Sequence, residues 1–320
     1  GTMRLRYLGI MGVRSFCTAQ VGSAPSPLES LEKSIRGLGG RRAFKSSGIQ
    51  QQAKQMAAKL AAGLGEKQLE PAQTTKLFNM LLDNTQDNTP LSEEIHRLMQ
   101  QCQCPADTDT FRYLLLAYSA HGDKQKGAVK VDALANMVLS QDWHSSIQVY
   151  NPLIDAYSRL SNMAKAEEYK RRMEGEGIGS NIQTYRSLIA GQGRRRDLEA
   201  VDAYVQEMNG AGIAADLPLY DTLLQIYFNE RRADLVDSVW RDMKANQWIT
   251  IDTRSYNRLL QIYVKLQNME MVLLLRDEMK AQGHALDSRS IVDLIRFLKD
   301  RNVLGDIDDM YEERSQLGLN

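Results

Sequence analysis

The sequence contains little cysteine, little proline, no long apolar run and no net charge. Only three of its 320 residues are cysteine and seven are proline. Three cysteines cannot build a disulfide framework, so we expect the mature fold to occupy a reducing compartment. No apolar stretch approaches the roughly 18–20 residues that a membrane-spanning helix needs. The sequence therefore predicts a protein that is not membrane-spanning.

Motifs of common enzymes are also missing. There is no glycine-rich phosphate loop, no His-Glu-x-x-His and no Cys-x-x-Cys. Cys102 and Cys104 have only His96 as a further soft ligand nearby, which favours two reduced thiols over a metal site. Three acids near the C-terminus could serve a nuclease, but acids also suit a solvated helix start. These acids are Asp306, Asp308 and Asp309. We expect no catalysis, no metal or other cofactor, and no small-molecule substrate.

Basic residues gather at the N-terminus, although the whole chain balances 40 basic against 40 acidic side chains. The first sixty residues hold ten basic and two acidic side chains, so the remainder is net acidic. The first 28 residues contain no acid and mix Arg, Ser and apolar residues. This composition is typical of an organellar import peptide, more mitochondrial than secretory. A disordered basic tail is the alternative.

Four segments follow from these patterns. We predict a mitochondrial targeting peptide over residues 1–28, a basic flexible arm over 29–48, an N-terminal helical cap over 49–71 and a repeat region over 72–320. The arm is expected to contact RNA or an acidic protein surface. Its cationic side chains are Lys33, Arg36, Arg41, Arg42 and Lys45.

A period of about 35 residues runs through most of the chain. Tyrosines recur at this spacing, a methionine follows each tyrosine by 23 residues, and an asparagine or aspartate closes each unit. The tyrosines are Tyr150, Tyr185, Tyr220 and Tyr256, the methionines Met173, Met208, Met243 and Met279, and the closing residues Asn181, Asp216, Asp252 and Asp287. Such regular recurrence indicates a repeat protein.

Each unit is expected to form two helices, because apolar residues recur at one-face spacing on both sides of a polar turn. In one unit, Tyr185, Leu188 and Ile189 precede the turn, and Val201 and Met208 follow it. A single helix pair cannot bury its apolar stripe, so the pairs must stack on their neighbours. We predict an all-α fold, an α-solenoid of about six 35-residue helix-turn-helix repeats with the Tyr/Met stripe as its inter-repeat core.

Two of these units resemble the pentatricopeptide repeat family. They read QVYNPLIDAYSRLSNMAKAEEYKRRMEGEGIGSN and RSYNRLLQIYVKLQNMEMVLLLRDEMKAQGHALD. The similarity lies in the Tyr-Asn opening, the second helix ending in Met and the closing Gly-x-x-x-Asp. The tetratricopeptide repeat differs in period and in its opening motif. The resemblance implies an organellar protein that binds single-stranded RNA, one base per repeat, along the surface of the first helices.

In that family, the residue after the opening tyrosine and the last residue of the repeat face the base together. The resemblance therefore makes eight residues base-facing candidates. The pairs are Asn151 with Asn181, Arg186 with Asp216, Asp221 with Asp252, and Asn257 with Asp287. Earlier units offer Asn79 with Asp107 and Arg112 with Ser146. Only the Asn-Asn and Asn-Asp pairs resemble the family's pyrimidine-reading pairs, and they are not contiguous. We interpret the chain as a repeat scaffold that has lost most of its sequence-reading capacity.

Charged turns suggest a second kind of RNA contact. Cations recur at the turns between the two helices of a repeat, whereas acids concentrate on the second helices. The phosphate-edge candidates are Arg159, Arg194, Arg195, Arg196, Arg231, Arg232 and Lys265. The acids include Glu167, Glu168, Glu199, Asp202, Glu207, Asp234, Asp237 and Asp242. The turn edge is expected to meet RNA phosphates while the acidic face meets protein, although charges also gather wherever solvent is.

Three functions are consistent with these features. The favoured one is a non-catalytic structural subunit of a mitochondrial ribonucleoprotein, most concretely the mitochondrial ribosome. It would bind RNA, such as ribosomal RNA, and other protein subunits of the assembly. The alternatives are a free organellar single-stranded-RNA-binding factor and, more weakly, a protein–protein scaffold in an organellar complex. The import-like N-terminus favours the mitochondrial matrix over a plastid.

Overall fold

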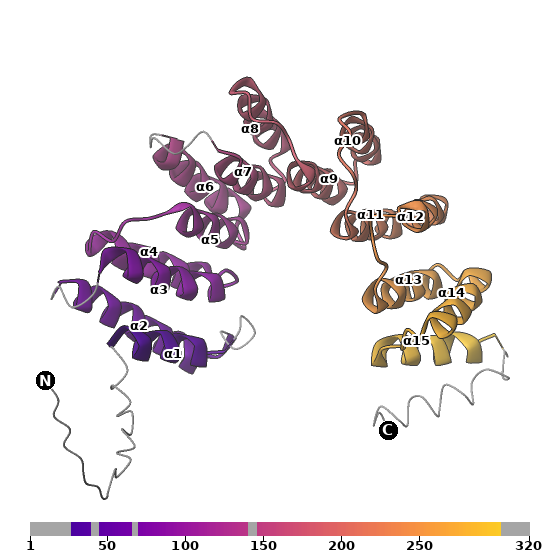
Figure 1. Ribbon diagram of the computed structural model, residues 1–320, viewed down its shortest axis with the longest axis horizontal. Coiled ribbons are helices and arrows are strands. Elements are labelled where there is room, and N and C mark those ends of the chain that lie inside the picture. The colour runs from indigo at the N-terminus through magenta and orange to yellow at the C-terminus, as the bar shows by residue number, and fades with distance from the viewer. Residues whose placement is uncertain (1–26, 40–44, 66–69, 140–145, 302–320) are drawn as a thin grey trace, which may run out of the picture.

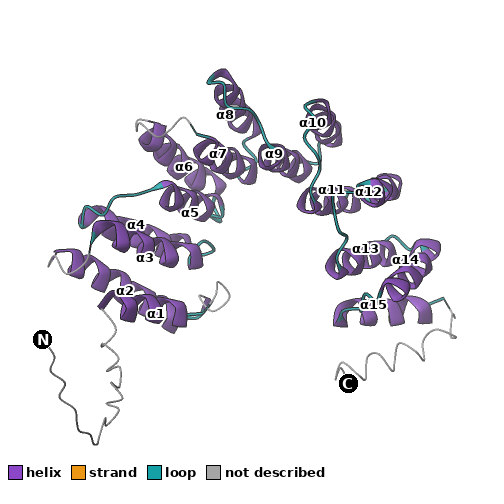
Figure 2. Ribbon diagram, viewed as in Figure 1, coloured by secondary structure: helices purple, strands orange, loops and turns teal. Residues whose placement is uncertain are grey.

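The computed structural model describes residues 27–39, 45–65, 70–139 and 146–301. Every regular element within these ranges is a helix, as Figure 2 shows. The helices are α1 (Pro27–Gly37), α2 (Ser47–Gly65), α3 (Pro71–Asn84), α4 (Thr89–Gln101), α5 (Thr108–Ser119), α6 (Lys124–Leu139), α7 (Ile147–Arg159), α8 (Met163–Gly175), α9 (Ile182–Arg195), α10 (Leu198–Gly210), α11 (Leu217–Asn229), α12 (Ala233–Ala245), α13 (Thr253–Lys265), α14 (Met269–Gln282) and α15 (Ser288–Lys299). The predicted all-α fold is confirmed.

From α3 onward the helices form two layers along an arc (Figure 1). We call the odd-numbered helices α3 to α15 the first helices and the even-numbered helices α4 to α14 the second helices. Successive first helices pack on one another from α3 to α15, and α11 and α13 make the sparsest of these contacts. The second helices α8, α10 and α12 lie on the outside of the arc. Stacked pairs of this kind are the predicted solenoid.

The N-terminal part differs from the sequence-based expectation. The span 29–48 was expected to be a flexible basic arm, but α1 covers most of its first half and packs against α2 and α3. Ile35 and Leu38 are buried in the same core as α3, and this apolar anchorage explains the helix. Of the arm's cations, Arg36 pairs with Glu32 at 2.6 Å, and Lys33 and Lys45 are exposed.

Several predicted features lie outside the described residues. They are the targeting peptide up to residue 26, the arm residues Arg41 and Arg42, and the acids Asp306, Asp308 and Asp309. The second helix expected for the last repeat also falls there, within residues 302–320. The described part of the predicted cap begins as α2 at Ser47, two residues before the expected start.

The Tyr/Met stripe forms the core between repeats, as predicted. All eight side chains are at most 8% exposed, and Tyr150, Met173 and Met208 are almost fully buried. The tyrosine hydroxyls reach the repeat's own second helix or its end: Tyr150 donates to Glu176 at 2.6 Å and Tyr185 to Glu207 at 3.1 Å. Each buried phenol therefore has a polar partner, which removes the cost of burying it.

A second column of tyrosines ties each repeat to the one before it. Two helical turns after the first column, Tyr157, Tyr227 and Tyr263 donate to an aspartate on the preceding second helix, at 2.6, 2.7 and 2.6 Å. These acceptors are Asp132, Asp202 and Asp237. Burial, and then the carboxylate partner, raises the pKa of all three phenols. The hydroxyls consequently stay protonated donors at any physiological pH.

The residue that closes each repeat caps the next first helix. Asn181, Asp216, Asp252 and Asp287 each precede a first helix and accept a hydrogen bond from the backbone N–H three residues later, at 2.7–3.1 Å. Asp107 does the same for α5 at 2.8 Å. Asn and Asp are preferred in this position because the side chain satisfies an unpaired amide. The recurring Asn/Asp thus has a structural role independent of any ligand.

Candidate nucleic-acid interface

The first base-facing pair is brought together and buried. Asn151, on α7, is 3% exposed. Its Nδ2 donates to Asn181 Oδ1 at 3.1 Å, and its Oδ1 accepts from the Thr184 hydroxyl at 2.7 Å. Asn79, Asp107 and Thr110 repeat this arrangement, with distances of 2.9 and 2.6 Å. In both repeats these side chains join consecutive first helices.

Asn257 is also occupied by the protein. It is 3% exposed, and its Nδ2 donates to the carbonyls of Thr253 and Ala285, both at 2.9 Å. Its Oδ1 accepts from the backbone N–H of Asp287 at 2.9 Å. Both amide hydrogens are therefore used, and the pair with Asp287 forms through the aspartate backbone.

The remaining candidate pairs are ion pairs or are separate. Arg186 contacts Asp216 at 3.2 Å across the boundary between α9 and α11. Asp221 pairs at 3.2 Å with Arg258 on α13, and no contact joins it to Asp252. In the earlier unit, Arg112 forms an ion pair with Asp109 at 3.0 Å and not a contact with its predicted partner Ser146. These side chains neutralise one another at positions where a sequence-reading repeat would present a hydrogen-bonding edge.

A groove of about 610 Å³ runs along the inner layer across α9, α11 and α13. Its charged lining comprises Arg194, Arg254 and Arg258 together with Asp221 and Asp252. A smaller hollow of about 350 Å³ lies at the beginnings of α5, α7 and α9, and the base-facing candidates Arg112, Asn151 and Asn181 are part of its lining. The larger groove carries a small excess of positive charge, although the repeat region as a whole is acidic.

The phosphate-edge candidates lie at the ends of the first helices and divide into two groups. Four have partners: Arg159 pairs with Asp155 at 2.8 Å, Arg196 with Glu230 at 3.5 Å and Arg232 with Asp234 at 2.7 Å, while Lys265 lies over the Phe228 ring at 5.4 Å. The other three, Arg194, Arg195 and Arg231, are exposed and form no salt bridge in the described structure. Burial of the Arg194 guanidinium in the groove lowers its pKa, and Asp155 attracts it. They are the cations available to a polyanion.

The acids of the second helices are less available than the sequence suggests. Glu167, Asp202, Glu207 and Asp237 accept hydrogen bonds from tyrosines or a lysine, so they hold repeats together. Glu168, Glu199 and Asp242 remain exposed. The acidic face proposed for protein contact is therefore smaller than the count of acids implies.

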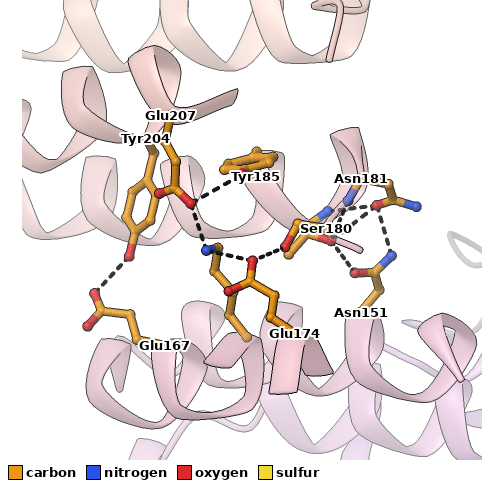
Figure 3. Close-up of polar contacts among 10 residues, drawn as sticks. Asn151, Glu167, Glu174, Ser180, Asn181, Tyr185, Tyr204 and Glu207 are labelled. Carbon is orange, nitrogen blue, oxygen red and sulfur yellow. Dashed lines mark hydrogen bonds and ion pairs between the residues drawn. The ribbon is translucent and has the colours of Figure 1, made fainter. Parts of the chain in front are cut away.

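A buried lysine on α8, Lys170, which the sequence analysis missed, contacts Glu207 on α10. Figure 3 shows Glu207 and the neighbouring Glu174, Tyr185 and Tyr204. Lys170 Nζ lies 2.8 Å from Glu174 and 2.7 Å from Glu207. Ser180 donates to Glu174 at 2.8 Å, and Tyr204 donates to Glu167 at 2.9 Å. Burial lowers the pKa of Lys170, but the hydrogen bonds to the two carboxylates outweigh it and leave the pKa raised.

Substituting Lys170→Met should reduce stability at pH 7 by about 1 kcal/mol, because two half-exposed carboxylates lose their cation. Burial raises the pKa of Glu174, but hydrogen bonds from Lys170 and Ser180 lower it below its ordinary 4.5. A lowered pKa stabilises the fold above pH 4.5, and the gain is lost as pH falls through the folded-state value. Urea unfolding from pH 7 to 3.5 should therefore show a shallower pH dependence in the variant. Lys280→Met, at an exposed position on α14, should leave both unchanged.

The cysteines flagged by the sequence lie where the first repeat ends. Cys104 is buried with its Sγ 3.2 Å from the Thr75 hydroxyl, and Cys102 donates to the Met99 carbonyl at 3.3 Å. Neither cysteine takes part in a disulfide. The described residues contain no cluster of three or more His, Cys, Asp or Glu arranged to hold a metal ion. None of the described helices is long and apolar enough to span a membrane.

Comparisons with known proteins agree with this geometry. Family models of the pentatricopeptide repeat match residues 148–178 and 254–284, and a model of the pentatricopeptide repeat domain matches residues 204–265. No curated protein sequence matches the chain. Among solved structures, a cysteine-to-serine variant of the pentatricopeptide repeat protein PPR10, in complex with an 18-nt PSAJ RNA element, superposes with a TM-score of 0.63 at 16% identity, covering 91% of this chain and 42% of that chain. PPR10 from maize gives a TM-score of 0.60 at 16% identity, covering 93% and 43%.

The fold and groove together define a helical-repeat protein whose inner surface is built by the first helix of each pair. The repeats over residues 148–178 and 204–284 match the pentatricopeptide repeat. The chain spans less than half of the length of the PPR10 structures that it matches.

Proposed function

We propose that the chain is a non-catalytic RNA-binding subunit of a mitochondrial ribonucleoprotein, most concretely the mitochondrial ribosome. It holds RNA through electrostatic contacts along the inner groove and the ends of the first helices. Neighbouring protein subunits contact the outer layer.

The state of the base-facing positions carries this proposal. Asn151 and Asn257 are buried, and Arg186 and Asp221 are paired with charges of the same protein. A sequence-reading factor needs several adjacent positions that present free hydrogen-bonding groups, since each silent position forfeits about 1–3 kcal/mol of discrimination. Exposed cations such as Arg194 and Arg195 attract any RNA backbone equally. Binding without sequence preference suits a subunit whose position is fixed by its assembly.

RNA binding itself is supported by the family and by the likeness to PPR10, which has been crystallised with an RNA element. The mitochondrial setting rests on the acid-free, arginine-containing N-terminus, which resembles an import peptide. The exposed Glu168, Glu199 and Asp242 on the second helices give protein subunits a surface distinct from the groove.

Co-sedimentation tests the assembly. Mitochondrial lysate is separated on sucrose gradients, with and without Mg²⁺ depletion to dissociate the ribosomal subunits. We expect the chain to migrate with intact ribosomes and to follow one subunit after dissociation. Migration in light, RNase-sensitive fractions would instead support the free RNA-binding factor. Migration in a membrane-associated complex free of RNA would support the protein scaffold.

A further inference from the structure

Trp248 is unusually exposed for a large aromatic side chain. It follows α12 and is 88% exposed, more than any other large hydrophobic residue in the described ranges. The equivalent position, five residues after the core methionine, holds Ile178, Ile213 and His284 in the other repeats. Those three are all partly buried, and His284 lies against the Tyr256 ring at 4.8 Å between centroids.

A missing glycine accounts for this difference. In the other repeats the preceding residue is Gly177, Gly212 or Gly283, with φ between 70° and 78°. This left-handed residue lets the following N–H bond to the core methionine carbonyl, which turns the next side chain inward. The equivalent residue here is Gln247, which is not among the positive-φ residues. The chain therefore leaves α12 by a different path.

The loop that carries Trp248 is held in place. The Trp248 backbone N–H donates to Asn246 Oδ1 at 3.0 Å. Asn246 Nδ2 in turn contacts the Ala215 carbonyl at 3.3 Å and the Tyr220 hydroxyl at 3.4 Å, at the start of α11. Ile249 and Ile251 pack against the core on the other side. The exposed indole is thus presented by an anchored backbone.

The loop connects α12 to α13 and is anchored to the residues before α11, and the starts of α11 and α13 both line the 610 Å³ groove. Leu217 and Pro218 at the start of α11 line it, and so do Asp252 and Arg254 where the loop enters α13. The groove also contains Arg194 and Arg258. Trp248 is not part of the groove lining, but it lies four residues before Asp252, which is. Proteins bind single-stranded nucleic acid without sequence readout by combining a cationic groove with aromatic side chains, because every base can stack on a ring.

We propose that Trp248 is a stacking platform for one base of a single-stranded RNA whose backbone follows the arginines of the groove. The proposal rests on the RNA binding proposed above and adds a contact that the base-facing positions do not provide. Stacking uses the face of the base, so it contributes affinity without hydrogen bonds from the base-facing side chains. Asn257 is buried and Asp221 is paired with Arg258, so neither supplies such a bond.

The test compares Trp248→Ala and Trp248→Phe with the wild type, using oligouridylate and an abasic ribose-phosphate oligomer of equal length. Loss of one stacked base should weaken oligouridylate binding by about 5- to 150-fold in the alanine variant. Phenylalanine should retain most of the affinity, and the abasic oligomer should bind all three proteins equally. Leu274→Ala removes another exposed apolar side chain, on the outer helix α14, and should change nothing.

Fluorescence gives a second readout. In a Trp143→Phe, Trp240→Phe background the remaining indole should be quenched by oligouridylate and not by the abasic oligomer; should that variant not fold, the wild type minus Trp248→Phe difference gives the same signal. Unchanged affinity and unquenched fluorescence in a chain that binds RNA would overturn the stacking role and assign Trp248 to a protein partner. Failure of the wild type to bind any RNA would instead refute the proposed function.

Discussion

Replacing Arg194 and Arg195 together by glutamate is expected to weaken single-stranded RNA binding by about 25-fold or more at 0.1 M salt. Each phosphate contact to a single strand contributes about 0.7 log units per tenfold change in salt, and two contacts are removed. Both residues are exposed at the end of α9, and neither forms a salt bridge in the described structure. The salt dependence of the dissociation constant, measured by fluorescence anisotropy, should become shallower by about 1.4 in slope.

Arg196 is left unchanged in this variant for a structural reason. It follows α9 and lies 3.5 Å from Glu230, so glutamate there would add a repulsion unrelated to RNA. The matched control reverses two exposed cations of the outer layer, Arg171 and Lys280. If the control loses as much affinity as the α9 variant, the contact is a general charge effect and not a groove interaction.

Asn151→Ala should destabilise the protein by about 1–3 kcal/mol while leaving RNA affinity unchanged in the folded fraction. The substitution removes the acceptor of the buried Thr184 hydroxyl and the donor to Asn181, which together join α7 to α9. Urea unfolding followed by circular dichroism measures the change. Gln183→Ala, at an exposed position on α9, serves as the control.

An opposite result would restore the base-reading interpretation. Such a result is an Asn151→Ala protein that is as stable as the wild type yet shows altered preference between oligouridylate and oligoadenylate. The amide would then have to turn out of its buried site to meet a base.

The 35-residue period of the sequence allowed most of the fold to be predicted. The 35-residue recurrence of Tyr150 and its counterparts located both helices of each repeat, because a buried stripe must recur wherever the same packing recurs. Helix α1 was not predicted, because basic residues and glycines dominate the sequence around it. The spacing of Leu31, Ile35 and Leu38 on one face was the available indication.

Whether the candidate base-facing side chains are free to contact RNA was harder to predict. Whether Asn151 faces a base depends on Thr184, a residue of the following repeat whose hydroxyl takes up the amide oxygen. Whether Asp221 repels phosphate depends on Arg258, thirty-seven positions away. Sequence patterns within one repeat cannot reveal a partner supplied by the next. The exposure of Trp248 did have a visible indication, the interruption of the glycine column by Gln247.

The sparse packing between α11 and α13 has a mechanical consequence. The backbones of α11 and α13 approach each other closely at fewer places than those of the other successive first helices, and Arg258 bridges the two helices through Asp221 at 3.2 Å and Gln225 at 3.1 Å. Screening by salt weakens such a polar bridge, whereas it leaves the apolar packing of the other first helices intact. We therefore expect bending stiffness along the arc to be lowest at this joint. Load imposed on the solenoid by a rigid assembly would be absorbed by flexing between these two helices, while the segments on either side move as blocks.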